Sequence, residues 1–271
     1  SYAEFCGSHN YFLSKHNKQT KNIHGVLDFN FNNETAYHFD AGLFADYLKN
    51  EICTDVRHYY DDITSVDKDE NGYLTSVNGM VHGPYKADLF IDCTGFKRLI
   101  GPEPDSVDCQ DRLFCDTAVA GRFDYRNKAI EQNPYTTCAA VEHGWIWKIP
   151  TRSRIGTGYC FNKSITDPDV VADAFVKHWD NRISKDELRL LDWKPQRVRK
   201  FWKGNVVTIG LSAGFIEPLE STGLALMIRG CEYLEECMYA CVYNPHYEPD
   251  VYNVRMKVAF ESAVDYITMH Y

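Results

Sequence analysis

The spacing of hydrophobic residues divides the chain into helical and extended segments. Apolar side chains that recur every three or four positions predict helices, and continuous or alternating apolar runs predict strands. The predicted helices cover 40–52, 166–179, 224–238 and 252–270. The predicted short strands cover 56–60, 63–66, 73–77, 87–92 and 205–210. Asn71 and Gly72 lie between the second and third of these strands, and this pair predicts a hairpin because it readily adopts positive φ angles.

The residue pattern changes between residues 113 and 162, where β-branched and aromatic residues form runs that are broken by turn residues. Three such runs, 135–141, 144–150 and 156–161, have short connections between them. Short connections join antiparallel strands, so this part of the chain predicts an antiparallel sheet. Asp167 and Pro168 then predict a capped helix start.

Composition narrows the class of protein. The 271 residues are 44% hydrophobic and 25% charged, which is typical of a globular protein and excludes a disordered or fibrous one. The net charge of −9 argues against nucleic acid or an anionic membrane as a partner. No apolar run is long enough for a membrane span and no signal-peptide pattern is present, so we expect a cytoplasmic protein. The ten cysteines form no C-x-x-C pair and no metal-ligand spacing, which predicts reduced thiols and no metal site.

The densest chemical signal is the loop at 211–223, between a buried strand and a helix. Ser221 and Thr222 stand where a helix would be capped, and Gly223 lets a ligand approach the backbone. A helix N-terminus binds anions through its unpaired N–H groups. Glu220 beside such a site suits a general base, although an acidic residue there can also merely favour the helix dipole.

Two further groups of residues are candidates for a binding site. Trp145 and Trp147 alternate along a predicted strand and therefore share one face, either as an aromatic wall for a planar ligand or as part of a core. The strand at 87–92 ends at Asp92 and runs into a loop with Gly95, and nucleotide cofactors bind at such strand ends in α/β sheets.

Together these runs resemble the flavin-dependent halogenase family, in its tryptophan-halogenase-like branch. The resemblance is carried by residues 37–41, 87–96, 144–150, 204–223 and 269–271. The loop also fits the family signature F-x-x-P-x-x-S-x-G through Phe215, Pro218, Ser221 and Gly223. The similarity extends over nearly the whole chain from about residue 36 onward.

The resemblance implies a mixed α/β fold. Residues 36–110 and 200–240 would belong to an FAD-binding module like that of flavin monooxygenases, without its first βαβ unit. Residues 111–199 would form an inserted, mostly antiparallel sheet with one helix on the substrate side. Residues 241–271 would begin a C-terminal helical region.

The resemblance also implies an activity. Reduced FAD, supplied by a separate flavin reductase, would react with oxygen to give a flavin hydroperoxide, and chloride or bromide would convert it to hypohalous acid. The acceptor would be an electron-rich aromatic compound, such as an indole or a tryptophan-like substrate. The family leaves a homodimer possible.

The resemblance also implies roles for individual residues, at the positions that match the family's motifs. Glu220 corresponds to the catalytic glutamate, and Ser221, Thr222 and Gly223 correspond to the halide site. Trp145, Trp147 and Phe215 would keep the substrate and the flavin apart. The residues expected to contact the cofactor are Asp92, Gly95, Gly210, Pro218, Thr222 and Gly223.

Two pieces of the family pattern do not occur in this sequence. No G-x-G-x-x-G follows a strand to hold the FAD pyrophosphate, and no lysine can be assigned to the family's catalytic lysine. We therefore expect the chain to be an internal portion of a longer polypeptide. Two alternatives remain open at this point: a flavin-dependent monooxygenase, and a non-catalytic remnant that binds a ligand or partner.

Overall fold

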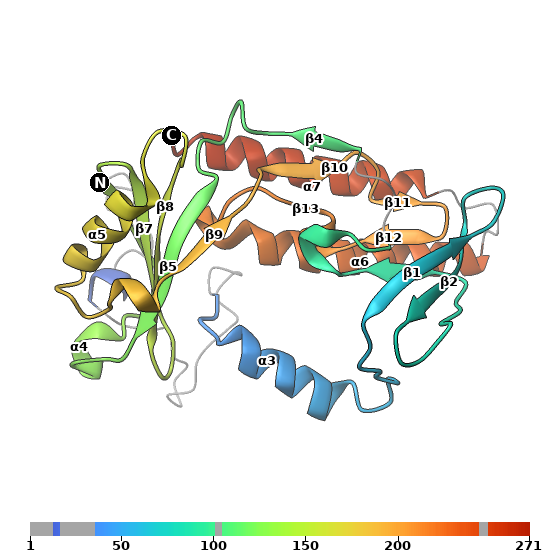
Figure 1. Cartoon of the computed structure of the whole chain (residues 1–271), viewed down its shortest axis with the longest axis horizontal. Helices are drawn as coiled ribbons and strands as arrows, with labels where there is room; N and C mark the ends of the chain where they lie inside the picture. Colours follow the sequence, from blue (N-terminus) through green and yellow to red (C-terminus); the bar gives the residue numbers. More distant parts are fainter. Residues whose placement is uncertain (1–12, 17–35, 101–104, 244–248) are drawn as a thin grey trace. The chain divides into compact units, whose positions relative to one another are not determined.

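The computed structural model describes residues 13–16, 36–100, 105–243 and 249–271, and it has a mixed α/β fold (Figure 1). The chain divides into two compact units. Unit 1 contains residues 1–57 and 117–192, and unit 2 contains residues 58–116 and 193–271. Each unit is described by itself below.

Unit 1 is built on an antiparallel sheet with the strand order β6-β7-β8-β5-β9. Its strands are β5 (Thr117–Phe123), β6 (Thr137–Val141), β7 (Gly144–Pro150), β8 (Ile155–Phe161) and β9 (Arg189–Asp192). A short helix, α4 (Lys128–Glu131), lies between β5 and β6. All the pairings in this sheet are antiparallel, which confirms the sheet predicted for 135–161.

Helix α5 (Pro168–His178) lies against one face of this sheet (Figure 1). The Asp167 carboxylate accepts a 2.8 Å hydrogen bond from the Asp169 N–H, and Pro168 occupies the first turn, as predicted. Val171 and Phe175 are fully buried. They form one core cluster with Val119, Ile146, Tyr159, Phe161 and Ala172. The hydrophobic stripe of α5 therefore explains why the helix docks on this sheet.

The predicted N-terminal helix is confirmed as α3 (Ala41–Tyr47), which continues into a π-helical turn at Leu48–Ile52. The Asp40 side chain accepts hydrogen bonds from the N–H groups of Gly42 and Leu43 and also forms an ion pair with Arg154. The neighbouring arginine lowers the pKa of Asp40 below its usual value, so the cap remains ionised. Asp40 thus anchors the helix start to the turn between β7 and β8.

The strand predicted at 56–60 is wrong, because the structure assigns these residues no strand. Val56, Tyr59 and Tyr60 are all more than half exposed, so alternation there does not mark a buried strand face. The Tyr59 ring instead packs against His82 and Tyr85. Contacts between aromatic rings hold this segment without a strand ladder.

Unit 2 begins with the predicted hairpin, β1 (Ile63–Lys68) and β2 (Leu74–Gly79). Gly72 in its turn has φ of 83°, the positive angle expected of the Asn-Gly pair. The Asn205 side chain donates to the Leu74 carbonyl and accepts from the Leu74 N–H, both at 2.8 Å. Leu74 and Val77 are buried in a cluster that also contains Phe90, Ile100 and Val206. The hairpin is thereby fixed to the strands that follow.

Two small sheets form the centre of unit 2. In one, β3 (Phe90–Asp92) runs parallel to β12 (Val206–Thr208), which pairs antiparallel with β11 (Trp202–Lys203). In the other, β10 (Gln196–Val198) lies between β4 (Ser106–Asp108) and β13 (Gly214–Phe215). Strand β3 is shorter than the predicted 87–92. Because β3 and β12 are parallel neighbours, their carboxyl ends meet at one edge of the sheet.

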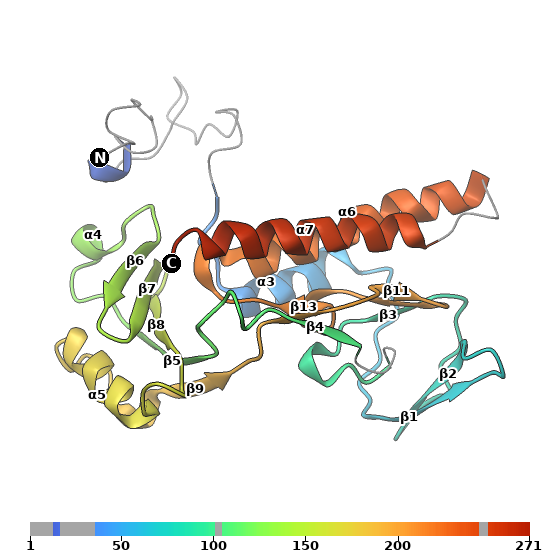
Figure 2. The same ribbon diagram turned by 90° about the horizontal axis from the view of Figure 1, so that it is seen from above.

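Two long helices complete unit 2, α6 (Thr222–Tyr243) and α7 (Asp250–Thr268), and they lie side by side (Figures 1 and 2). Helix α7 buries a stripe at helical spacing, consisting of Tyr252, Met256, Phe260, Val264 and Ile267. The Asn253 side chain accepts from the N–H groups of Phe201 and Trp202 and donates to the Trp202 carbonyl, which fixes α7 to β11. No helix of the described residues is long and apolar enough to cross a membrane.

Replacing Phe175 tests the packing of α5 on the sheet. Phe175→Ala removes a fully buried ring and should lower the free energy of unfolding by about 3–5 kcal/mol. Val170→Ala is the matched control on the same helix, because Val170 is 52% exposed and its loss should change stability by less than about 0.5 kcal/mol. Chemical denaturation measures both, and equal losses in the two variants would contradict the docked position of α5.

Candidate functional site

The loop after β12 is a series of tight turns. The chain leaves Thr208 and bends at Gly210, whose φ of 73° is readily reached only by glycine. It then forms a 3₁₀ turn at Gly210–Ser212, the short strand β13, and a second 3₁₀ turn at Leu219–Ser221. This second turn leads directly into α6, so the loop delivers the site residues to the N-terminus of that helix.

The turn at Glu220 and Ser221 has an unusual backbone. Their φ angles are 60° and 54°, in the left-handed region that non-glycine residues rarely adopt. Such conformations cost about 1–3 kcal/mol each and persist only where the surroundings hold them, which is common at functional sites. Here Leu219 is buried, and the Ser221 N–H donates a 3.0 Å hydrogen bond to the Pro218 carbonyl.

This turn corrects the helix start predicted at Leu224, because α6 begins at Thr222. The helix follows directly after the two left-handed residues, and among the described residues the Thr222 hydroxyl does not cap it. Within the described chain, the buried hydroxyl of Thr222 has no hydrogen-bond partner. A buried, unsatisfied hydroxyl costs about 1–3 kcal/mol, so a ligand atom that accepts from it would recover this energy.

The space around the Gly223 Cα is not tightly filled by neighbouring protein atoms. A Cβ built on it would meet only the Phe215 ring, at 3.6 Å, which is an ordinary contact. The N–H groups of the first helical turn of α6 lack intrahelical acceptors and carry the positive end of the helix dipole. Thr222 and Gly223 therefore fit a small anion such as a halide, and they leave room for a flat cofactor against the backbone.

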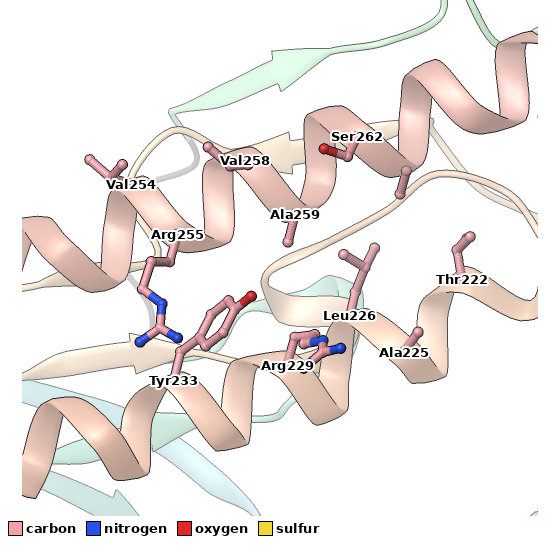
Figure 3. Close-up of a pocket in the computed structure, with 11 residues that line it drawn as sticks. Thr222, Ala225, Leu226, Arg229, Tyr233, Val254, Arg255, Val258, Ala259 and Ser262 are labelled. Carbon is pink, nitrogen blue, oxygen red and sulfur yellow. The ribbon is translucent and has the colours of Figure 1, made fainter. Parts of the chain in front are cut away.

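A groove of about 490 Å³ begins beside Thr222 and runs between α6 and α7 (Figure 3). It is lined mainly by apolar and small side chains, with Arg229, Tyr233 and Arg255 along its length. Arg229 forms an ion pair with Glu232, and Arg255 forms an ion pair with Glu236 and stacks on the Tyr233 ring. Because both arginines are neutralised, this groove is not a second anion site.

Glu220 itself is accessible. Its side chain is 44% exposed, and its Oε1 lies 3.3 Å from Nε2 of His270, just beyond the end of α7. A carboxylate held beside an anion-binding helix N-terminus can orient an electrophile or accept a proton.

Glu217 is the residue of this loop that sequence reasoning missed. It is fully buried, and its Oε1 accepts a 2.7 Å hydrogen bond from the Tyr271 hydroxyl. Burial and the Glu217 charge raise the pKa of Tyr271 above its usual value, so the hydroxyl keeps its proton and donates. The signal in the sequence was the second carboxylate in the run that contains Glu220 and the tyrosine in the closing run 269–271.

Asp92, predicted to contact the cofactor, lies fully buried at the end of β3. Its Oδ1 accepts from the Thr94 N–H, the Thr94 hydroxyl and the Ser212 hydroxyl, and its Oδ2 accepts from the Ile100 N–H. The Arg98 Nε donates to the Ser212 carbonyl at 2.8 Å. The structure thus brings together the two loops predicted to contact the cofactor, after β3 and after β12, and Asp92 is the hub between them.

The glycine and aromatic residues of these two loops also lie close together. Gly95 has φ of 74° and opens a 3₁₀ turn at Gly95–Lys97, where a Cβ would meet nothing within 4 Å. Phe96 and Phe215 contact edge-to-face, with ring centroids 6.0 Å apart. The Phe215 ring also meets Trp193. Phe215 is therefore held in a fixed position above Gly223.

Trp145 and Trp147 lie on β7 in unit 1. Ile146 between them packs toward α5, so the two indoles lie on the opposite face of the sheet, with ring centroids 5.9 Å apart. The buried indole N–H of Trp145 has no hydrogen-bond partner in the described residues. The Trp147 ring lies directly over Gly158, where a Cβ would be 2.1 Å from it. The aromatic face predicted from the alternation is present, and Gly158 makes room for it.

Comparison with known proteins identifies the class to which this fold belongs, the flavin-dependent halogenases. The family model described as tryptophan halogenase matches residues 7–271. Because this match covers nearly the whole chain, the chain belongs to the tryptophan halogenase family.

Among curated proteins, tryptophan 7-halogenase RebH from Lentzea aerocolonigenes is 34% identical over 242 residues, which cover 87% of this chain and 45% of RebH. Among solved structures, the tryptophan 6-halogenase SttH from Streptomyces toxytricini has a TM-score of 0.83 at 32% identity and covers 94% of this chain and 52% of SttH. BrvH, a flavin-dependent halogenase from Brevundimonas sp. BAL3, has a TM-score of 0.82 at 30% identity and covers 94% of this chain and 52% of BrvH. The chain therefore spans about half the length of the relatives it matches.

Gly158 offers a test of the tryptophan face. Gly158→Ala should displace the Trp147 ring, change the tryptophan fluorescence, and lower the free energy of unfolding by about 1–3 kcal/mol through overpacking. Gly156→Ala is the matched control two residues away on β8, where the nearest atom to a new Cβ is the Ile149 carbonyl oxygen at 3.8 Å. The assigned packing is wrong if the two variants have the same stability and fluorescence.

Proposed function

We propose that the protein containing this chain is an FADH₂- and O₂-dependent halogenase of an electron-rich aromatic substrate, with an indole or tryptophan-like compound as the leading candidate. The observation that carries this proposal is the turn at Glu220 and Ser221. It holds an accessible carboxylate beside a helix N-terminus whose buried Thr222 hydroxyl has no hydrogen-bond partner among the described residues. Family membership and the halogenase names of the relatives support the same activity.

The halide would bind at the start of α6. The N–H groups of Thr222 and Gly223, the Thr222 hydroxyl, and Ser221 would surround it, with the helix dipole favouring its negative charge. The loops around Asp92, Gly95, Gly210 and Pro218 would hold the flavin next to this anion. When bound, reduced FAD with oxygen supplies the oxidation that makes the halide electrophilic. A separate flavin reductase would deliver the reduced cofactor.

Glu220 would act on the aromatic substrate. Its carboxylate would accept a hydrogen bond from the electrophilic halogen species and would then take the proton that the ring loses when the carbon–halogen bond forms. Trp145 and Trp147, together with Phe215, would keep the substrate away from the flavin. This separation would favour halogen transfer over direct oxygenation.

The proposed modules follow from these roles. Residues 36–110 and 200–240 would belong to the FAD-binding module, and 111–199 to the substrate side. Residues 241–271 would begin the C-terminal helical region. In this arrangement the carboxyl ends of β3 and β12 would form the cofactor edge, as in other α/β sheets that bind nucleotides.

Glu220→Gln tests the catalytic carboxylate. The amide cannot accept the ring proton as a carboxylate does, so halogenated product should fall by about a hundredfold or more while flavin reoxidation continues. Glu232→Gln, which removes another exposed carboxylate further along α6, is the control and should keep full activity. Mass spectrometry of product and absorbance of the flavin measure the two rates. Unchanged halogenation in Glu220→Gln would reject the assigned role.

Thr222→Val tests the halide site. The change removes a hydroxyl that has no partner in the part of the chain that the structure describes and keeps the side-chain shape, so stability should not fall. Loss of one hydrogen bond to an anion, about 1.5–3 kcal/mol, should raise the bromide concentration needed for half-maximal halogenation by about tenfold or more.

Thr208→Val gives the opposite pattern. Its buried hydroxyl donates to the Phe201 carbonyl, so the variant should lose stability while its bromide dependence stays normal. Identical bromide dependence in the Thr222 variant and the wild type would place the halide elsewhere.

A further inference from the structure

The C-terminal end of α7 holds the carboxylate loop at two points. Tyr271 donates to Glu217, and His270 contacts Glu220. The His270 ring is itself fixed on its other side, since its Nδ1 lies 3.0 Å from the carbonyl oxygen of Tyr266. The ring also contacts the Tyr266 ring edge-to-face at 5.1 Å. His270 therefore bridges the Tyr266 carbonyl in the last turn of α7 and the carboxylate of Glu220.

Each ring nitrogen of His270 faces an oxygen atom: Nδ1 faces the Tyr266 carbonyl, and Nε2 faces the Glu220 carboxylate at 3.3 Å. A carbonyl oxygen and a carboxylate accept hydrogen bonds, so the ring nitrogen is the donor in each of these contacts. The contact between Nε2 and Oε1 therefore holds Glu220 through a proton carried by Nε2.

The contact with His270 restricts the position of the Glu220 carboxylate. Glu220 sits in a left-handed conformation that costs energy, and its side chain is 44% exposed, so rotamer freedom would otherwise spread the carboxylate over several positions. The contact to His270 engages Oε1. Within the described residues, Oε2 makes no hydrogen bond and is the oxygen left to meet a ligand.

We propose that His270 is the positioning residue of Glu220. Its Nδ1 is fixed by the end of α7, and its Nε2 holds Oε1 so that Oε2 is presented to the substrate. This inference rests on the proposed halogenase function for its kinetic consequence, whereas the bridge itself does not depend on that function.

Two substitutions separate the hydrogen bond from the bulk of the ring. His270→Gln places an amide N–H near the position of Nε2 and should keep halogenation within about threefold of the wild type. His270→Phe keeps a ring without a donor and should lower kcat for halogenation by about tenfold to a hundredfold through misplacement of Glu220. Substrate KM and flavin reoxidation should stay unchanged in both variants. Met269→Ala, at a 76% exposed neighbour, is the control for local disturbance and should behave as the wild type.

Two kinetic results would contradict the positioning role of His270. Equal loss in His270→Gln and His270→Phe would assign His270 a packing role only and overturn the proposal. A change in KM without a change in kcat would also overturn it, because His270 would then contribute to binding rather than to positioning Glu220.

A measurement without turnover tests the bridge independently. In ¹⁵N NMR of the histidine rings, the Nε2 resonance of His270 should shift in Glu220→Gln but not in Glu232→Gln. An Nε2 signal insensitive to Glu220→Gln would overturn the bridge. If the wild type makes no halogenated product while these spectra behave as expected, the proposed function fails and the bridge stands.

Discussion

The left-handed turn at Glu220 and Ser221 is the constraint on which the site depends. By reversing the chain within two residues, it lets α6 start at Thr222 and leaves Glu220 outside the helix rather than in its first turn. If these residues had ordinary helical angles, the helix would begin earlier and the carboxylate would point along its side. The cost of the turn is met by contacts from elsewhere in unit 2: Leu219 is buried in the core, and the end of α7 bonds to Glu217 and Glu220.

A second set of polar bonds keeps the site edge together. The Asp92 carboxylate accepts from both the loop after β3 and Ser212 in the loop after β12, and Arg98 ties Ser212 to Ser106 on β4. Because Asp92 is fully buried, the loss of any one donor would remove a hydrogen bond that no water molecule could replace. These bonds help two loops with several positive φ angles to stay ordered, and they make a direct contact of the Asp92 carboxylate with the flavin less important than its role in shaping the loops.

Much of the fold could be predicted because its signals are local. The antiparallel strands at 135–161, the Asn71-Gly72 hairpin and the Asp167 cap each depend on residues close together in the sequence, and the structure has all three. The prediction of a strand at 56–60 was wrong because the alternating apolar residues there are exposed. The predicted start of α6 was wrong because no glycine or asparagine marks the left-handed turn, so the sequence carries no signal for it. Glu217 and His270 could not be assigned roles from the sequence, since their partners lie 54 and 50 residues away, at Tyr271 and Glu220.

The most direct test of the account follows the fate of oxygen and halide in a single reaction. The complete protein is supplied with reduced FAD, ¹⁸O₂, bromide and an indole, and the mass of the product is measured by mass spectrometry. The account predicts a product in which one hydrogen is replaced by bromine and which contains no ¹⁸O. A product that carries ¹⁸O and no bromine would contradict it, because it would show that the site transfers oxygen to the ring instead of halogen.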